Sequence, residues 1–151
     1  MKIDEIVEDV EATYGSLTSP RLSPSILDRM ESMDTTKHRA LLKRIADRFE
    51  EDFEPNADRS ACYRVFDDAH EGIVMFSIVG DYIAATEPFH SRIGSILSAA
   101  KGTFVDHKTL EQSLAADTRV DEAYFAFDPP VTISNLLFAD YDIDWSGTSG
   151  G

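Results

Sequence analysis

The chain has 151 residues, 42% of them hydrophobic, so it can build a core and is unlike a disordered chain. Its formal net charge of −14 repels nucleic acid and anionic membranes and favours basic protein partners. The acidic N-terminus is unlike a signal peptide, no apolar stretch approaches the roughly 20 residues of a membrane span, and the single Cys62 cannot form an internal disulfide. We expect one cytoplasmic globular domain over residues 1–145, followed by a flexible tail over 146–151.

The N-terminal third of the chain has helical periodicity. Apolar residues spaced three and four apart predict an amphipathic helix over residues 3–14. Ser23 followed by Pro24 is typical of a helix start and predicts a second, short helix. Asp34 is the candidate cap of a third helix that runs to about Phe53.

The periodicity changes between residues 61 and 87. The runs ACYRVF, GIVMFSIV and DYIAAT are rich in aromatic and β-branched residues, which indicates three strands. Gly80-Asp81 predicts a two-residue hairpin turn between the second and third runs, so we expect an antiparallel meander. Because GIVMFSIV is apolar at nearly every position, we expect its strand to be central and covered on both faces.

After Pro88 the pattern predicts a helix over about 90–100 and another that Asp106 caps. Strands are then predicted over 120–127 and 131–145, although residues 132–139 are equally compatible with a helical turn. The order α-α-α-β-β-β-α-α-β-β is typical of an α+β domain. We expect about five mainly antiparallel strands with helices packed on one face of the sheet.

The last predicted strand carries the candidate binding residues. A period of two places Asp140, Asp142 and Asp144 on one face, with Tyr141 and Trp145 on the apolar face. Residues 51–151 contain 18 acids and 6 Lys or Arg, whereas residues 1–50 contain 10 and 8. This row of carboxylates, with Tyr141 or Trp145 at its margin, is therefore predicted to contact a basic partner.

The opposite charge gathers in residues 37–48. Five cations lie there, namely Lys37, Arg39, Lys43, Arg44 and Arg48. A solvated helix face is the simplest interpretation. A basic stripe that meets the acidic region within the chain, or across a homodimer, is the alternative.

Known site motifs are absent from the sequence. An EF-hand loop starting at Asp140 would need glycine at Trp145 and glutamate at Gly151, so calcium binding of that type is excluded. There is no GxGxxG, GxxxxGK[ST] or GxSxG. No metal-ligand spacing connects the four histidines, so each is expected to be an isolated surface or turn residue. We therefore expect no cofactor, no metal site and no catalytic residue.

The leading hypothesis is a small acidic binding module that neutralises a basic partner and is not an enzyme. An immunity or inhibitor protein of a toxin, or of a protein that acts on nucleic acid, needs this composition. Two alternatives stay open: a dimeric secretion-type chaperone, and an enzyme whose carboxylate and histidine site is assembled from dispersed residues. A purely solubilising, salt-adapted surface is a further interpretation, which the near-neutral first fifty residues disfavour.

Overall fold

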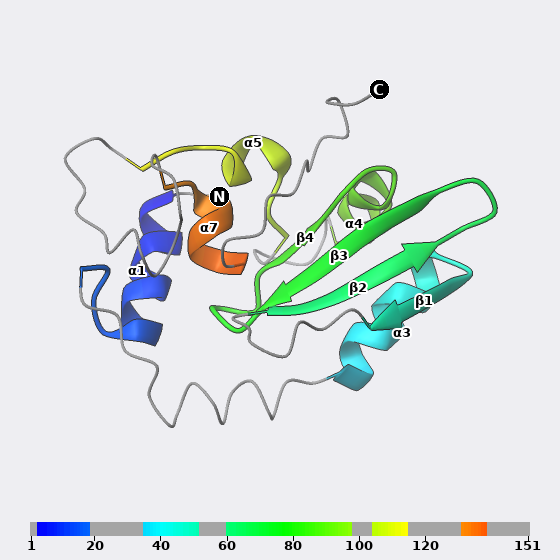
Figure 1. Cartoon of the computed structure of the whole chain (residues 1–151), viewed down its shortest axis with the longest axis horizontal. Coiled ribbons are helices and arrows are strands. Elements are labelled where there is room, and N and C mark those ends of the chain that lie inside the picture. The colour runs from blue at the N-terminus through cyan, green and yellow to red at the C-terminus, as the bar shows by residue number, and fades with distance from the viewer. Residues whose placement is uncertain (1–2, 19–34, 52–59, 98–103, 115–130, 139–151) are drawn as a thin grey trace.

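The computed structural model describes residues 3–18, 35–51, 60–97, 104–114 and 131–138. Within them the chain forms an α+β domain around a four-stranded antiparallel sheet of order β1-β2-β3-β4 (Figure 1). The strands are β1 (Arg48–Glu51), β2 (Ser60–Phe66), β3 (Glu71–Ser77) and β4 (Ile83–Ala85). The α+β class and the predicted meander of β2, β3 and β4 are confirmed.

Five helices flank this sheet in the described part of the chain. They are α1 (Ile3–Tyr14), α3 (Thr35–Ile45), α4 (Phe89–Leu97), α5 (His107–Leu110) and α7 (Ile133–Phe138). The predicted helix over 3–14 is confirmed, and so are the helix near 90–100 as far as Leu97 and the Asp106 cap of α5. No described helix has both the length and the apolarity that crossing a bilayer requires.

The prediction of one helix from Asp34 to about Phe53 is wrong. Helix α3 ends at Ile45, and the chain then enters β1, which pairs with β2. The Asp47 amide donates to the Phe66 carbonyl at 3.1 Å. The Phe49 ring packs edge-on against Tyr63 with centroids 6.0 Å apart. These cross-strand contacts outweigh the helical spacing of the apolar residues.

The predicted strand over 131–145 is also wrong where the structure describes it. Residues 133–138 form α7, so the helical alternative holds there. The Thr132 amide donates to Asn135 Oδ1 at 3.0 Å, and the Asn135 amide donates to Thr132 Oγ1 at 3.3 Å. This reciprocal pair is a capping box, which satisfies two amides that a helix start would otherwise leave free.

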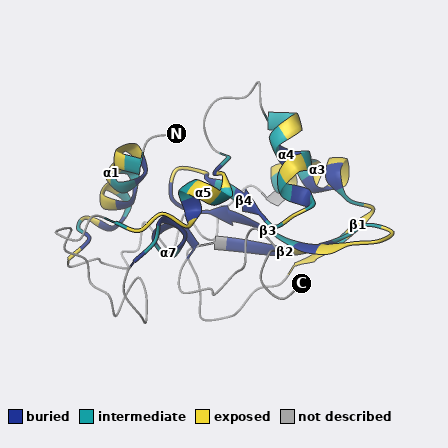
Figure 2. Cartoon of the chain, turned by 90° about the horizontal axis from the view of Figure 1, so that it is seen from above, coloured by how far each residue is buried: buried dark blue, intermediate teal, exposed yellow. Residues whose placement is uncertain are grey.

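The central strand β3 separates two apolar clusters. Val74 and Phe76 point into a cluster with α3 and α4, whereas Met75 between them joins a cluster with α1, α5 and α7. Figure 2 shows α3 and α4 over one face of the sheet, and α1 and α7 together near its other end. The prediction that β3 is covered on both faces is confirmed. The helices divide between the two clusters, whereas we expected them to pack on one face of the sheet.

The predicted turn at Gly80-Asp81 is confirmed. Both residues have positive φ, +57° and +56°, as a type I′ turn requires. The Tyr82 amide donates to the Val79 carbonyl at 3.2 Å and closes the turn. The turn fixes the register of β3 and β4, and it carries Tyr82 toward α1.

We predict that Gly72→Ala lowers the free energy of unfolding by about 1–3 kcal/mol, because it overpacks the contact between β3 and α4. A Cβ at Gly72 would lie 2.5 Å from a ring carbon of Phe89 and 2.7 Å from the Thr86 hydroxyl oxygen. Urea denaturation measures the effect. The same substitution in a Phe89→Leu background should cost less, and an equal cost in both backgrounds would contradict the steric origin.

Candidate functional site

The predicted contact residues Asp140, Tyr141, Asp142, Asp144 and Trp145 lie outside the described residues. Their role as a partner surface therefore stays a prediction. The described part of the chain presents two other features of functional interest. One is the acidic face of α1, and the other is a cluster of a glutamate and two histidines beside β4.

The acidic face consists of the exposed α1 residues Asp4, Glu5, Glu8 and Glu11. Helix α1 contains no Lys or Arg. Glu8 lies four residues after Asp4 and three from both Glu5 and Glu11, so these carboxylates are neighbours on the helix surface. None of the ion pairs found among the described residues involves any of them.

The opposite side of α1 holds this face in place. Ile6, Val10 and Tyr14 are buried against the cluster that includes α7. The Tyr82 hydroxyl donates to Asp9 Oδ2 at 2.5 Å and connects α1 to the turn between β3 and β4. Burial and the Asp9 carboxylate raise the pKa of Tyr82, so its proton stays in place at neutral pH. The acidic face is therefore presented by a helix that the core and a hydrogen bond fix.

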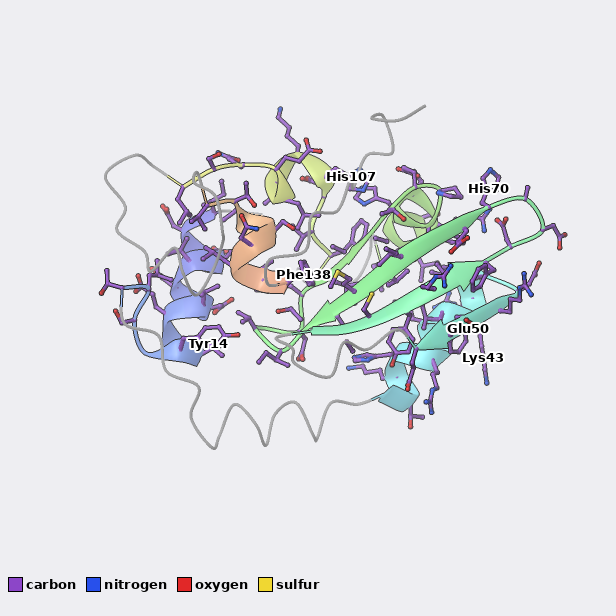
Figure 3. The ribbon with its side chains drawn as sticks, viewed as in Figure 1. Tyr14, Lys43, Glu50, His70, His107 and Phe138 are labelled. Carbon is purple, nitrogen blue, oxygen red and sulfur yellow. The ribbon has the colours of Figure 1, made fainter. Side chains whose placement is uncertain are left out.

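The basic residues of α3 and β1 lie at the other end of the molecule from α1 (Figure 3). The five cations predicted for one helix are exposed, with four in α3 and Arg48 in β1. Figure 3 shows Tyr14 of α1 and Lys43 of α3 at opposite ends of the structure. Within the basic region, Arg39 pairs with Glu51 at 2.7 Å. Helix α1 is therefore acidic and α3 is basic, and β1 next to α3 also exposes Glu50 and Glu51.

The second feature, the histidine cluster, consists of Glu87, His90 and His107. One potential ligand atom from each residue lies within 4.8 Å of the others. Glu87 precedes α4, His90 lies in the first turn of α4, and His107 begins α5. The two imidazole rings have centroids 3.6 Å apart.

The backbone beside β4 brings the two histidines together. The Val105 amide donates to the Ile83 carbonyl at 2.9 Å, and Phe104 forms a parallel bridge with Ile83. The chain before α5 therefore runs alongside β4 and delivers His107 to the Ala85 carbonyl, 2.7 Å from its Nε2. The Ser91 hydroxyl lies 2.9 and 3.0 Å from the two Glu87 carboxylate oxygens and donates to them.

The sequence-based expectation for the histidines is corrected by these contacts. His70 does lie in a turn, where it contacts Asp67. His90 and His107 are half-buried neighbours, and His38 stacks on Phe76 with ring centroids 3.8 Å apart. One local signal for the cluster is present, a Glu-x-x-His spacing at 87–90 just where a helix starts. The approach of His107 depends on tertiary structure and has no sequence signature.

The protonation of His90 is disfavoured in the folded state. Burial lowers its pKa below the ordinary value, and the neighbouring His107 lowers the pKa further. A histidine with a depressed folded pKa binds fewer protons in the native than in the unfolded chain. Its contribution to stability is therefore present above pH about 6.5 and is lost as the pH falls below that.

We predict that the free energy of unfolding decreases between pH 7.5 and 5, and that this decrease is smaller in His90→Gln because glutamine does not titrate. Denaturant unfolding at each pH measures it. Lys108→Gln, a change at an exposed residue of α5 outside the cluster, is the control. An identical decrease in the parent and His90→Gln would contradict the assignment.

Comparisons with known proteins identify no relative of this chain. No family model matches it. No curated protein and no solved structure matches it either. A functional assignment therefore depends on the surfaces and side chains described above.

Proposed function

We propose that the protein is an acidic binding module that neutralises a basic protein partner, in the manner of an immunity or inhibitor protein. The observation that carries this proposal is the acidic face of α1. Four exposed carboxylates lie on one fixed helix with no cation among them. A surface of one sign attracts a partner of the other sign and accelerates its association.

The repulsion among the α1 carboxylates favours a role in binding rather than in stabilising the fold. Neighbouring like charges three and four residues apart destabilise a helix by about 0.2–0.5 kcal/mol per pair. Asp4 and Glu5 in the first turn interact favourably with the helix dipole, but Glu8 and Glu11 are beyond that turn. The fold therefore gains nothing from these later carboxylates, whereas a cationic partner would compensate their repulsion.

The contrast in charge between α1 and α3 favours a directed interaction over general solubility. A protein adapted to salt carries acids over its whole surface. Here α3 presents Lys37, Arg39, Lys43 and Arg44, while α1 presents acids only. In the proposed complex the partner faces α1. Asp140, Asp142 and Asp144, with Tyr141 or Trp145, are proposed to contact the partner as well.

We predict that Glu8→Gln raises the free energy of unfolding slightly, by about 0.2–0.5 kcal/mol for each like-charge neighbour removed. Thermal or urea unfolding at low ionic strength measures the change, which should shrink as salt screens the repulsion. Glu111→Gln, an exposed change outside α1, serves as the control. A loss of stability in Glu8→Gln would show that this carboxylate serves the fold instead.

We predict that the tagged protein retains a basic protein from an extract of its source cells at low ionic strength and releases it as salt rises. Two variants locate the contact: Glu5→Gln/Glu8→Gln/Glu11→Gln in α1, and Asp140→Asn/Asp142→Asn/Asp144→Asn. The purified partner should bind each variant more slowly in surface plasmon resonance, because steering depends on charge.

Glu50→Gln/Glu111→Gln removes two exposed acids that belong to neither group of variants and should leave the association rate near that of the parent. The proposal is wrong if both groups of variants retain the partner with unchanged rates and salt dependence. If only the variant of residues 140–144 fails to bind, the contact surface lies there and α1 is not part of it.

A further inference from the structure

The histidine cluster has the donor set of a transition-metal site. Two imidazoles and one carboxylate come from two segments that meet beside β4, and one potential ligand atom of each lies within 4.8 Å of the others. Imidazole nitrogen and carboxylate oxygen are common ligands of zinc and its neighbours, and two histidines with one carboxylate recur in such sites.

The hydrogen bond of His107 leaves the other ring nitrogen available for a metal. A carbonyl oxygen can only accept, so the 2.7 Å contact with the Ala85 carbonyl places the ring proton on Nε2. In the neutral ring the lone pair is then on Nδ1. Metal-binding histidines commonly donate their second nitrogen to a carbonyl or carboxylate, which fixes the orientation of the ring.

His90 offers a second and independent indication. Its Nδ1 is buried and has no hydrogen-bond partner among the described residues. Buried ring nitrogens in folded proteins normally have a partner, because an unsatisfied polar atom costs free energy. A cation bound in this cluster would accept a ring-nitrogen lone pair, so the buried nitrogen would no longer be unsatisfied.

The carboxylates around the histidines complete the favourable setting. The Ser91 hydroxyl holds the Glu87 carboxylate at the start of α4. Asp106 precedes His107, and its Oδ1 accepts from the Thr109 amide at 2.7 Å, so it caps α5 and places a further negative charge nearby. These negative groups attract a cation toward the two imidazoles.

The separation of the donors sets the movement that binding requires. Tetrahedral ligands at about 2.0–2.1 Å from an ion are about 3.3 Å apart. The donors of the cluster, within 4.8 Å of one another, would approach by roughly 1.5 Å at most.

We propose that Glu87, His90 and His107 bind a divalent first-row transition-metal ion of the zinc type. Three protein ligands leave at least one coordination position for water or an external ligand. Magnesium and calcium, which prefer sites made of oxygen ligands, are not expected to bind here. The site is separate from the acidic face of α1, and this proposal does not depend on the proposed function.

Isothermal titration of the full chain with zinc chloride at pH 7.5 and high ionic strength tests the site. We predict one zinc ion per chain and a rise in the thermal unfolding temperature with zinc concentration, since zinc binds the folded form. His107→Gln and His90→Gln should each weaken zinc affinity by at least about tenfold. Magnesium at millimolar concentration should not compete.

Two control variants distinguish this site from other zinc-binding groups. His70→Gln removes an exposed histidine that is not part of the cluster, and Glu5→Gln/Glu8→Gln/Glu11→Gln removes the acidic face; both should keep the parent affinity. Glu87→Gln changes an exposed side chain and should fold normally, so its weaker zinc binding remains informative if a histidine variant fails to fold. The proposal is overturned if the parent binds no zinc at 1 mM, or if the folded cluster variants bind it as the parent does.

Discussion

The fold depends on the burial of β3 on both faces. Val74 and Phe76 belong to one apolar cluster, and Met75 belongs to the other. A shift of one residue in the pairing of β2 and β3 would exchange these side chains between two clusters of different shape. The burial of this strand therefore fixes the register of the sheet, and with it the side on which each helix packs.

Both functional features follow from this division. On one side, α1 packs with α7 near the Ser77 end of β3, where the Ser77 hydroxyl donates to the Leu137 carbonyl at 2.7 Å. The apolar face of α1 is occupied, so its carboxylates point outward. The histidine cluster lies where the two apolar clusters meet. Phe104 contacts one cluster and Val105 belongs to the other, which sets the position of His107 two residues later.

Sequence predicted the elements whose signals are local. The spacing of Ile6, Val10 and Tyr14 is enough to predict α1. Gly80-Asp81 is enough to predict the turn between β3 and β4. The local sequence does not predict β1, because Arg48 to Glu51 gain their strand contacts only from β2. The capping box of α7 uses asparagine in place of the usual glutamate or glutamine, so its signal is weak. The approach of His107 to His90 arises from the path of residues 104–107 beside β4, which no local pattern encodes.

The two proposals invoke different kinds of attraction. The α1 carboxylates attract any cation through long-range charge, and salt within the physiological range screens this attraction over about 8 Å. The histidine cluster instead offers lone pairs at short range, and its affinity depends on donor type and on protons more than on salt. Asp106 caps α5, and the Ser91 hydroxyl donates to the Glu87 carboxylate. The donors of the cluster are therefore partly positioned before an ion binds. An acidic chain therefore concentrates cations near its surface, but selection of one metal requires the imidazoles that the sheet brings together.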